Sequence, residues 1–301
     1  MSLLVTGSIG IDTVETPSGK AVDALGGSSI YFAYAASFFS PVRLVGVVGD
    51  DCPADFLAPV RANDRIDLTG LEIREGSKTF RWHGRYHEDV NERDTVSVDL
   101  NVLAERAPDI PEAFRDSTYV FLANTHPALQ AELLSQLANP SLVVADTMDL
   151  WISAERPALM DLLERIDGLV LNDSEAKLLT GEPNVVAAGM QIAQTVRRFV
   201  VVKKGEHGSL LFADGRVFAM PSYPTRKVID PTGAGDSFAG AMMGRVAAED
   251  SPETATLRRA IAYGTVTASF GLEDFSLNRF VALDRDEIER RAAEFAELTA
   301  F

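Results

Sequence analysis

The feature that most constrains the fold of this chain is a regular alternation of short apolar segments with helical patterns. The apolar, strand-like segments are residues 3–7, 43–49, 119–123, 142–146, 169–172 and 199–203. The clearest helical patterns are residues 28–39, 129–138, 158–166, 175–181 and 236–249, followed by a long C-terminal pair. This alternation is typical of βαβ units, whose buried parallel strands are covered by helices. We therefore expect an α/β fold of three layers with a mostly parallel central sheet.

One segment, residues 66–100, breaks this alternation. It has no helical period and carries β-prone triplets separated by turn residues and charges, as an antiparallel flap would. We expect a small β-rich lid here, with residues 12–24 on the lid side. Because neither a long linker nor an internal repeat is visible, we expect residues 1–301 to form a single domain.

Charge and hydropathy exclude several classes of protein. The formal net charge of −16 argues against a surface that follows a nucleic-acid backbone. The longest apolar run, residues 30–39, is about half the length of a membrane-spanning helix. A single cysteine, Cys52, excludes an intrachain disulfide, and strand-like residues start at Leu3 with no room for a cleavable leader. We expect a cytoplasmic protein with no membrane and no nucleic-acid partner.

The segment DPTGAGDSFAG, residues 230–240, combines a glycine-rich turn with an acid at a helix start. Gly233 and Gly235 allow a positive φ and a close backbone approach, and the unpaired N–H groups of a helix start favour an anion. Asp236 beside such a site would be well placed to take a proton from an attacking hydroxyl. The pattern therefore favours phosphoryl transfer to an alcohol, while a simple capped turn is the alternative.

Two other phosphate-binding motifs do not fit. A dinucleotide-binding fingerprint requires a third glycine where this chain has Phe238, which disfavours a dehydrogenase. No segment supplies the Gly-Lys-Ser/Thr of a P-loop.

The glycine-rich turn resembles the signature of the ribokinase-like (PfkB) family of carbohydrate and nucleoside kinases, an Asp-x-x-Gly-Ala-Gly-Asp turn. Four further stretches are similar to motifs of that family and occur in the same order. They are GSIGID (7–12), Gly26-Gly27, NDSE (172–175) and KKGEHGSLLF (203–212). The resemblance covers nearly the whole chain and implies a ribokinase-like fold.

The resemblance also implies roles for the residues of the turn. Asp236 would be the general base, and the amides of Gly233, Ala234 and Gly235 would stabilise the transferring phosphoryl group.

The nucleotide and its metal would lie beside this turn. Asn172 and Glu175 would hold Mg²⁺ through water, although NDSE is also an ordinary capped helix start. The residues that would border ATP are Lys204, Gly205, Glu206 and Gly208. Asp230 and Thr232 occupy positions that in some relatives help to bind a monovalent cation such as K⁺.

The acceptor would lie on the other side of the turn. The resemblance implies that Asp12, Gly26 and Gly27 bind its hydroxyl groups. Tyr31 stands where sugar-specific relatives often have Asn, so its ring could stack on a sugar or a base, or belong to the core. Asn124 follows a strand end, where open α/β sheets place ligand-binding residues.

The lid would contribute one of its two faces. Alternation along a strand places Arg81, His83 and Arg85 on one face and Trp82 and Tyr86 on the other. We expect Arg81 and His83 to close over the acceptor or its new phosphate, with a solvated flap as the alternative. The exposed strands of the lid also suggest a homodimer.

The sequence thus predicts an ATP- and Mg²⁺-dependent kinase that phosphorylates a hydroxyl of a small sugar. A nucleoside kinase of the same fold is the nearest alternative. A non-catalytic sensor of nucleotide or sugar is a further alternative, although a sensor would not need Asp236.

Overall fold

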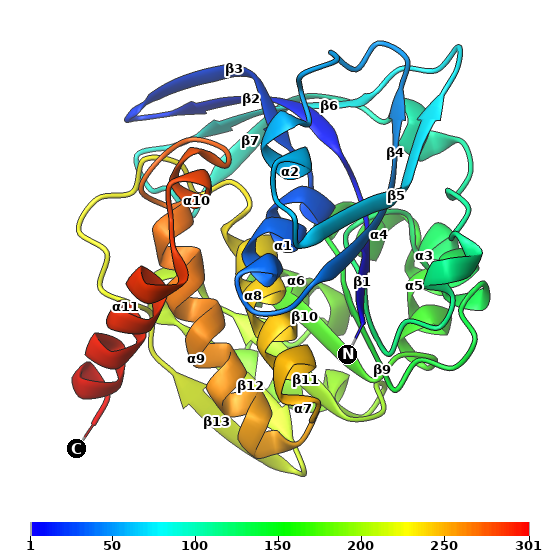
Figure 1. Ribbon diagram of the computed structural model, residues 1–301. Helices are drawn as coiled ribbons and strands as arrows, with labels where there is room; N and C mark the ends of the chain where they lie inside the picture. Colours follow the sequence, from blue (N-terminus) through cyan, green and yellow to red (C-terminus); the bar gives the residue numbers. More distant parts are fainter. Residues whose placement is uncertain (1, 301) are drawn as a thin grey trace.

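The computed structural model describes residues 2–300. In this part of the chain, nine strands form the larger sheet, in the order β13-β12-β11-β10-β9-β8-β1-β4-β5 (Figure 1). These strands are β1 (Leu3–Thr6), β4 (Val42–Gly49), β5 (Ile66–Arg74), β8 (Tyr119–Leu122), β9 (Leu142–Asp146), β10 (Gly168–Asn172), β11 (Phe199–Lys203), β12 (Ser209–Ala213) and β13 (Arg216–Met220). Only β12 and β13 pair antiparallel with their neighbours in this sheet. The six strands expected from apolar runs are all present.

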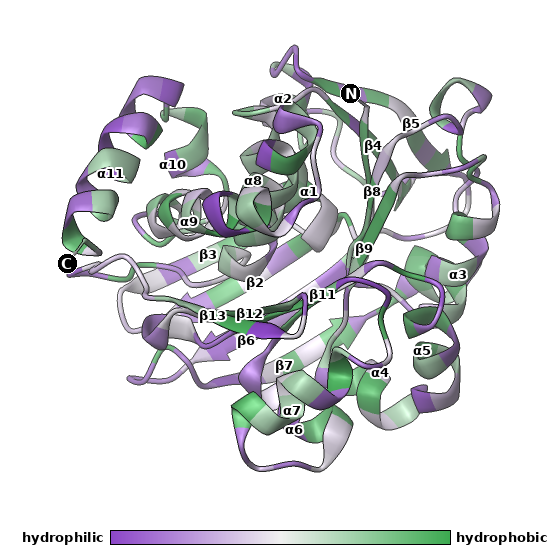
Figure 2. Cartoon of the chain, turned by 90° about the horizontal axis from the view of Figure 1, so that it is seen from below, coloured by the Kyte–Doolittle hydropathy of each residue, from purple (hydrophilic) through white to green (hydrophobic). Residues whose placement is uncertain are grey.

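Helices cover both faces of this sheet. On one face lie α1 (Ser28–Ser37), α8 (Ala234–Glu249), α9 (Thr254–Gly271), α10 (Asn278–Val281) and α11 (Arg285–Leu298). On the other lie α3 (Pro127–Ser135), α4 (Asp149–Ala154), α5 (Arg156–Leu163), α6 (Asp173–Thr180) and α7 (Val185–Ile192), while the short α2 (Ala58–Arg61) precedes β5. Each face has its own apolar cluster, and Figure 2 shows the strands between them as mostly hydrophobic. The predicted three-layer α/β fold is confirmed.

Helix α8 is held unusually close to α1, which fixes the glycine-rich turn at its start. A Cβ atom at Gly240 would lie 2.2 Å from the carbonyl oxygen of Phe32. Only glycine permits this approach, so the N-terminus of α8 is placed by backbone contact with α1.

A second sheet forms the lid, in the order β3-β2-β6-β7. Its strands are β2 (Gly10–Thr16), β3 (Gly19–Gly26), β6 (Phe80–Tyr86) and β7 (Arg93–Asp99). The β2–β6 pair is parallel and joins the two lid segments, which are about seventy residues apart in sequence.

The predicted lid boundary at residue 66 is wrong. Residues 66–74 form β5, which pairs parallel with β4 at the edge of the larger sheet. Ile66 is buried there, because this strand covers the last apolar edge of the body instead of entering the lid. The inserted part of the lid therefore begins at β6.

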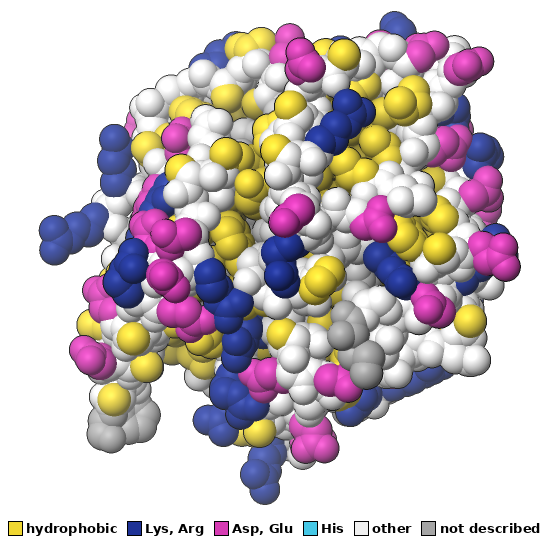
Figure 3. Space-filling view, viewed as in Figure 1, with side chains coloured by type: hydrophobic (Ala, Val, Ile, Leu, Met, Phe, Trp, Pro, Cys, Tyr) yellow, Lys and Arg dark blue, Asp and Glu magenta, His cyan; other side chains and the backbone are white. Residues whose placement is uncertain are grey.

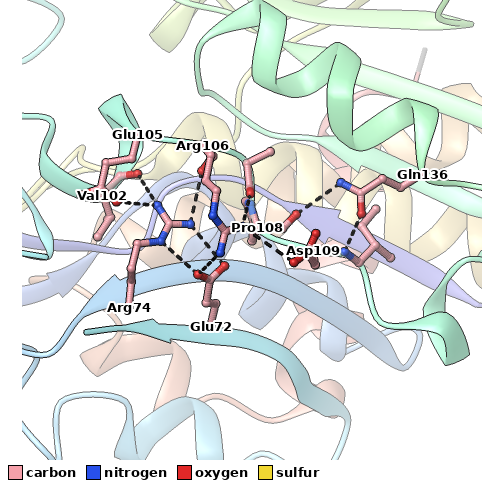
Figure 4. A network of polar contacts seen from close by, with 10 residues as sticks. Glu72, Arg74, Val102, Glu105, Arg106, Pro108, Asp109 and Gln136 are labelled. Atoms are coloured by element: carbon pink, nitrogen blue, oxygen red, sulfur yellow. Dashed lines mark hydrogen bonds and ion pairs between the residues drawn. The ribbon is translucent and has the colours of Figure 1, made fainter. Parts of the chain in front are cut away.

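The chain returns from the lid to the body through two short 3₁₀ helices, Asn101–Ala104 and Glu112–Phe114. Figure 4 shows how ion pairs fasten this return segment to β5. Arg74 bonds to Glu72 at 3.0 Å and to Glu105 at 2.9 Å, and Arg106 reaches the same Glu72 at 2.7 Å. The base of the lid is thereby attached to the edge of the larger sheet.

Acidic and basic side chains are interspersed over the face shown in Figure 3. Among residues 2–300, no helix has both the length and the apolar character needed to cross a membrane.

Candidate active site

The carboxyl ends of the parallel strands meet at a cleft of about 620 Å³ beneath the lid. Asn124, Asp146, Asn172 and Lys203 lie at or just beyond the ends of β8, β9, β10 and β11, and all four line this cleft. Parallel α/β sheets place their ligands at this edge. The N-terminal turn of α8 closes the base of the cleft.

The glycine-rich turn presents free backbone donors to the cleft. Gly233 precedes α8 with a φ of 73°, and a Cβ atom there would lie 2.3 Å from the ring of Tyr31. Within residues 2–300, the amides of Gly233 and Gly235 have no hydrogen-bond acceptor, whereas the Ala234 amide donates to the carbonyl of Pro231 at 3.2 Å. Two unpaired N–H groups at a helix N-terminus form a site for an anion.

Asp236 lies in the first turn of α8, facing the cleft beside these amides. Burial raises the pKa of its carboxyl to about 6, and the positive charges of Lys203 and Arg93 oppose a larger rise. A carboxylate with this pKa is ionised at neutral pH and still basic enough to accept a proton.

Asp12, which is predicted to bind the acceptor, has only 4% of its surface exposed and is not among the residues that line the cleft. A Cβ atom at Gly26 would lie 1.9 Å from Oδ2 of Asp12, so this position requires glycine. Oδ1 of Asp12 is buried without a hydrogen-bond partner. Burial, together with the nearby charges of Asp230 and Asp236, raises the pKa of Asp12 to about 8. An unpaired buried oxygen of this kind is available to a hydroxyl group of a ligand.

We expect Asp12→Asn to stabilise the fold, and more so at high pH. The pKa of Asp12 is about 8 in the folded chain against an ordinary value of 3.8, so ionisation of this carboxyl opposes folding increasingly between these two values. Asn has the same shape and no charge, so the Tm should rise by several degrees at pH 8 and much less at pH 4.5. Thermal unfolding at both pH values measures this, with the exposed Asp55→Asn as the control. A gain of equal size at both values would contradict the pKa assigned to Asp12.

Tyr31 and Asp230 contact the glycine-rich turn and help to hold its shape. Tyr31 is 3% exposed and its ring packs against Gly233, which favours the core interpretation over stacking on a ligand. The carboxylate of Asp230 accepts hydrogen bonds from the amides of Thr232 at 2.8 Å and Ser276 at 3.3 Å. Asp230 thus shapes the turn, and its assignment with Thr232 to a monovalent cation stays a prediction.

The NDSE segment forms the capped helix start that was one of its two interpretations. The Asn172 side chain accepts from the Glu175 amide at 2.8 Å, and the Glu175 carboxylate accepts from the Asn172 amide at 2.7 Å. Both side chains also line the cleft, and burial raises the pKa of Glu175. Asp146 lies near, with its Oδ1 buried and without a partner. These hard oxygen atoms fit the ligand preference of Mg²⁺, either directly or through water.

The nucleotide-side turn differs from expectation at one residue. Gly205, Glu206 and Gly208 line the cleft as predicted, but Lys204 does not. The lysine that lines the cleft is Lys203, the last residue of β11. The signal in the sequence that points to Lys203 is its position at a strand end.

The structure does not bring Arg81 and His83, the lid residues expected to cover the acceptor, to the cleft. In the parallel β2–β6 pair, Asp12 lies opposite Trp82 and Thr13 lies opposite His83. Residues opposite each other point to the same face of a sheet, so Trp82 and Tyr86 share the face of Asp12. Tyr86 lines the cleft accordingly.

Arg81 and His83 point to the outer face and are paired there. His83 lies 3.1 Å from Glu15, and Arg81 lies 3.3 Å from Asp23. Neither side chain lines the cleft. Of the aromatic pair on the other face, Tyr86 lines the cleft.

Comparisons with known proteins agree with this fold. The family model of the pfkB family carbohydrate kinases matches residues 19–279. The chain is 29% identical over 248 residues to the cytidine kinase of Thermococcus kodakarensis, covering 81% of this chain and 87% of the relative. It is 26% identical over 289 residues to fructokinase-1 of Oryza sativa, covering 86% of each. The structure of the Burkholderia thailandensis nucleoside kinase in complex with inosine superposes with a TM-score of 0.78 at 19% identity, covering 99% of both chains.

The fold is that of the ribokinase-like kinases. The chain belongs to the pfkB family of carbohydrate kinases. It is an ATP-binding phosphotransferase, a sugar or nucleoside kinase, as the sequence predicted.

Proposed function

We propose that this kinase transfers the γ-phosphoryl group of ATP to a hydroxyl on the sugar of a nucleoside, with Asp236 as the general base. The observation that carries the proposal is the position of Asp236 beside the unpaired amides of Gly233 and Gly235, in the cleft at the strand ends. Backbone amide donors can bind the negatively charged phosphoryl oxygens, and a carboxylate beside them can accept the proton of the alcohol. Together they suit phosphoryl transfer to a hydroxyl group.

The chemical step follows from these positions. The acceptor hydroxyl gives its proton to the Asp236 carboxylate while its oxygen bonds to the γ-phosphorus. The bond from the γ-phosphorus to the bridging oxygen breaks, and its electron pair stays on ADP. The amides of Gly233 and Gly235 bind the transferring oxygens, and Asp12 orients the acceptor through its unpaired Oδ1. Asn172 and Glu175 would hold Mg²⁺, which when bound neutralises phosphate charge.

The lid favours a nucleoside over a free sugar, which reverses the order expected from sequence. Trp82 and Tyr86 lie on the lid face that Asp12 shares, so an acceptor bound by Asp12 lies beneath aromatic rings. The indole of Trp82 lies flat along the strand, where a Cβ atom at Gly84 would be 2.0 Å from its ring. Aromatic surfaces bind bases by stacking, a contribution of about 1–3 kcal/mol per base. A small free sugar has no base and would contact this aromatic surface only with its own ring.

We expect a panel of ATP acceptors to separate the two classes. ADP release with Mg²⁺ should be fastest with a ribonucleoside such as cytidine or inosine and slower with ribose or fructose. Trp82→Ala should raise the KM for the nucleoside by about tenfold, since loss of one stacking contact costs on the order of 1–3 kcal/mol. Its KM for a free sugar should not change.

The control for Trp82→Ala is Arg85→Ala, which changes the outer face of the lid where Arg85 pairs with Glu15 at 2.8 Å. A preference for a free sugar, together with no effect of Trp82→Ala, would instead support the sugar kinase. ATP binding with no transfer to any acceptor would favour the sensor.

A homodimer through the lid remains part of the proposal. Val22 on β3 and Val96 and Val98 on β7 are 62%, 46% and 45% exposed. Apolar side chains on the two edge strands of a small sheet suit contact with a second copy.

A further inference from the structure

We propose that Lys203 and Arg93 are further catalytic residues, which bind the transferring phosphoryl group from the body and from the lid. This inference rests on the proposed function, because it assigns the charges of the same transfer step. Neither residue was expected from the sequence.

Lys203 reaches the glycine-rich turn from the end of β11. Its ammonium nitrogen lies 2.6 Å from the position that a Cβ atom at Gly235 would occupy. The space that a side chain at Gly235 would fill is thus taken by a positive charge, beside an unpaired amide. An oxygen atom bound by that amide would also contact Lys203.

Lys203 forms no direct ion pair with a carboxylate in the described chain. Asp146, Glu175 and Asp236 surround it, and burial raises the pKa of each while Lys203 opposes the rise. Within residues 2–300, none of the three lies within ion-pair distance of its ammonium group. A lysine held among three acids without a direct partner remains free to bind an anionic ligand.

Arg93 enters the same cleft from the lid. It is the first residue of β7 and lies opposite Tyr86 in the β6–β7 register, so both side chains face the cleft. Its guanidinium lies 5.9 Å from the centre of the Trp82 ring, and no acidic partner is recorded for it in the described chain. The charge of Arg93 acts on Asp236 and Glu175, since it opposes the rise that burial causes in the pKa of both carboxyls.

The lid lies close to the body on both sides of Arg93. On one side, the hydroxyl of Thr232 donates to the hydroxyl of Tyr86 at 3.2 Å, which joins β6 to the glycine-rich turn. On the other, Oδ1 of Asn91 lies 2.5 Å from the position of a Cβ atom at Gly205, which has a φ of 52°. The β6–β7 hairpin therefore reaches from the glycine-rich turn to the nucleotide-side turn, with Arg93 between these two places.

This arrangement suits the charge that phosphoryl transfer develops. The three outer oxygens of the γ-phosphoryl group and the bridging oxygen share the negative charge while the acceptor bond forms and the bond to ADP breaks. Lys203 and Arg93 neither take a proton nor form a covalent bond in this step. Lys203 and Arg93 supply two full positive charges to a site whose other donors are backbone amides. Because Arg93 is part of the lid, its guanidinium acts only when the lid closes the cleft.

The test replaces each cation by Met and measures kcat, both KM values and the binding of ADP with aluminium fluoride and Mg²⁺. The control variants are Lys177→Met, a partly exposed helix lysine paired with Asp173, and Arg85→Met on the outer face of the lid. We expect Lys203→Met and Arg93→Met each to lower kcat by about tenfold to a hundredfold, in the range of other lost donors to a transition state. The acceptor KM should stay near that of the wild type, and Lys203→Arg should restore part of kcat.

The fluoride complex separates this inference from the proposed function. Wild type should bind ADP with aluminium fluoride much more tightly than ADP alone, and both Met variants should lose most of this preference. That measurement needs no acceptor turnover, so equal preference in variants and wild type overturns the inference even if the acceptor is misassigned. Normal kcat in both variants would also overturn it, while leaving Asp236 as the base. A lowered Tm with unchanged kcat would reveal a purely structural role and overturn it too.

Discussion

Asp236→Asn is expected to lower kcat by about 10²–10⁴-fold, the contribution typical of a positioned general base. Asn keeps the shape of the side chain and leaves the first turn of α8 intact, but it cannot accept the proton of the acceptor hydroxyl. The wild-type enzyme should lose kcat/KM as the pH falls through about 6, because burial raises the pKa of Asp236 to that value and only the carboxylate acts as the base. Above that pH the rate should level off.

Steady-state rates between pH 5 and pH 9 measure both effects. Asp161→Asn, an exposed change on α5, is the control for loss of one negative charge. The variant should show no rise in rate near pH 6. If Asp236→Asn keeps a rate close to that of the wild type, another group takes the proton and the assigned role of Asp236 is wrong.

Gly233→Ala is expected to lose both folding free energy and activity. Its φ of 73° is unfavourable for any residue with a side chain, and the new methyl group would lie 2.3 Å from the ring of Tyr31. The left-handed conformation costs about 1–2 kcal/mol and overpacking about 1–3 kcal/mol, so the free energy of unfolding should fall by about 2–5 kcal/mol. The turn would have to shift to separate the methyl group from the Tyr31 ring. This shift would move the amides that face the phosphoryl group, so kcat should also fall.

Gly215→Ala is the matched control for this change. Gly215 has a φ of 69°, and a Cβ atom there has nothing within 4 Å, so the variant isolates the backbone cost. Urea denaturation should show a loss of only about 1–2 kcal/mol for Gly215→Ala. Equal losses in both variants would show that the contact with Tyr31 carries no energy.

The body of the fold could be predicted from sequence because its signals are local. Buried parallel strands such as β9 and β11 are continuous apolar runs, and the helices between them have their own period. β5 was assigned to the lid because its mixture of polar and apolar residues is that of an edge strand, and the sequence does not reveal which edge it occupies. Of the antiparallel strands that follow the nucleotide-side turn, β12 was recognised only as part of the motif at residues 203–212, and β13 was not predicted.

The part of the candidate site that could be predicted consists of functional residues that are adjacent in the sequence. The glycine-rich turn and Asp236 are adjacent, and their geometry follows from the helix start. The lid was not predictable in this way, because the face that covers the cleft depends on the pairing of Asp12 with Trp82 across seventy residues. Arg93 is likewise brought to Asp236 only by the folding of the β6–β7 hairpin over the body.

The most direct test of the central claim is a ³¹P NMR time course of the wild-type protein with ATP, Mg²⁺ and a ribonucleoside. We predict that a phosphomonoester signal grows in step with ADP, in equal amounts, with no inorganic phosphate. ADP accompanied by inorganic phosphate alone would show hydrolysis without transfer, and unchanged ATP with every acceptor would show that the cleft binds without catalysis. Either result would contradict transfer to an alcohol by Asp236 and the glycine-rich turn.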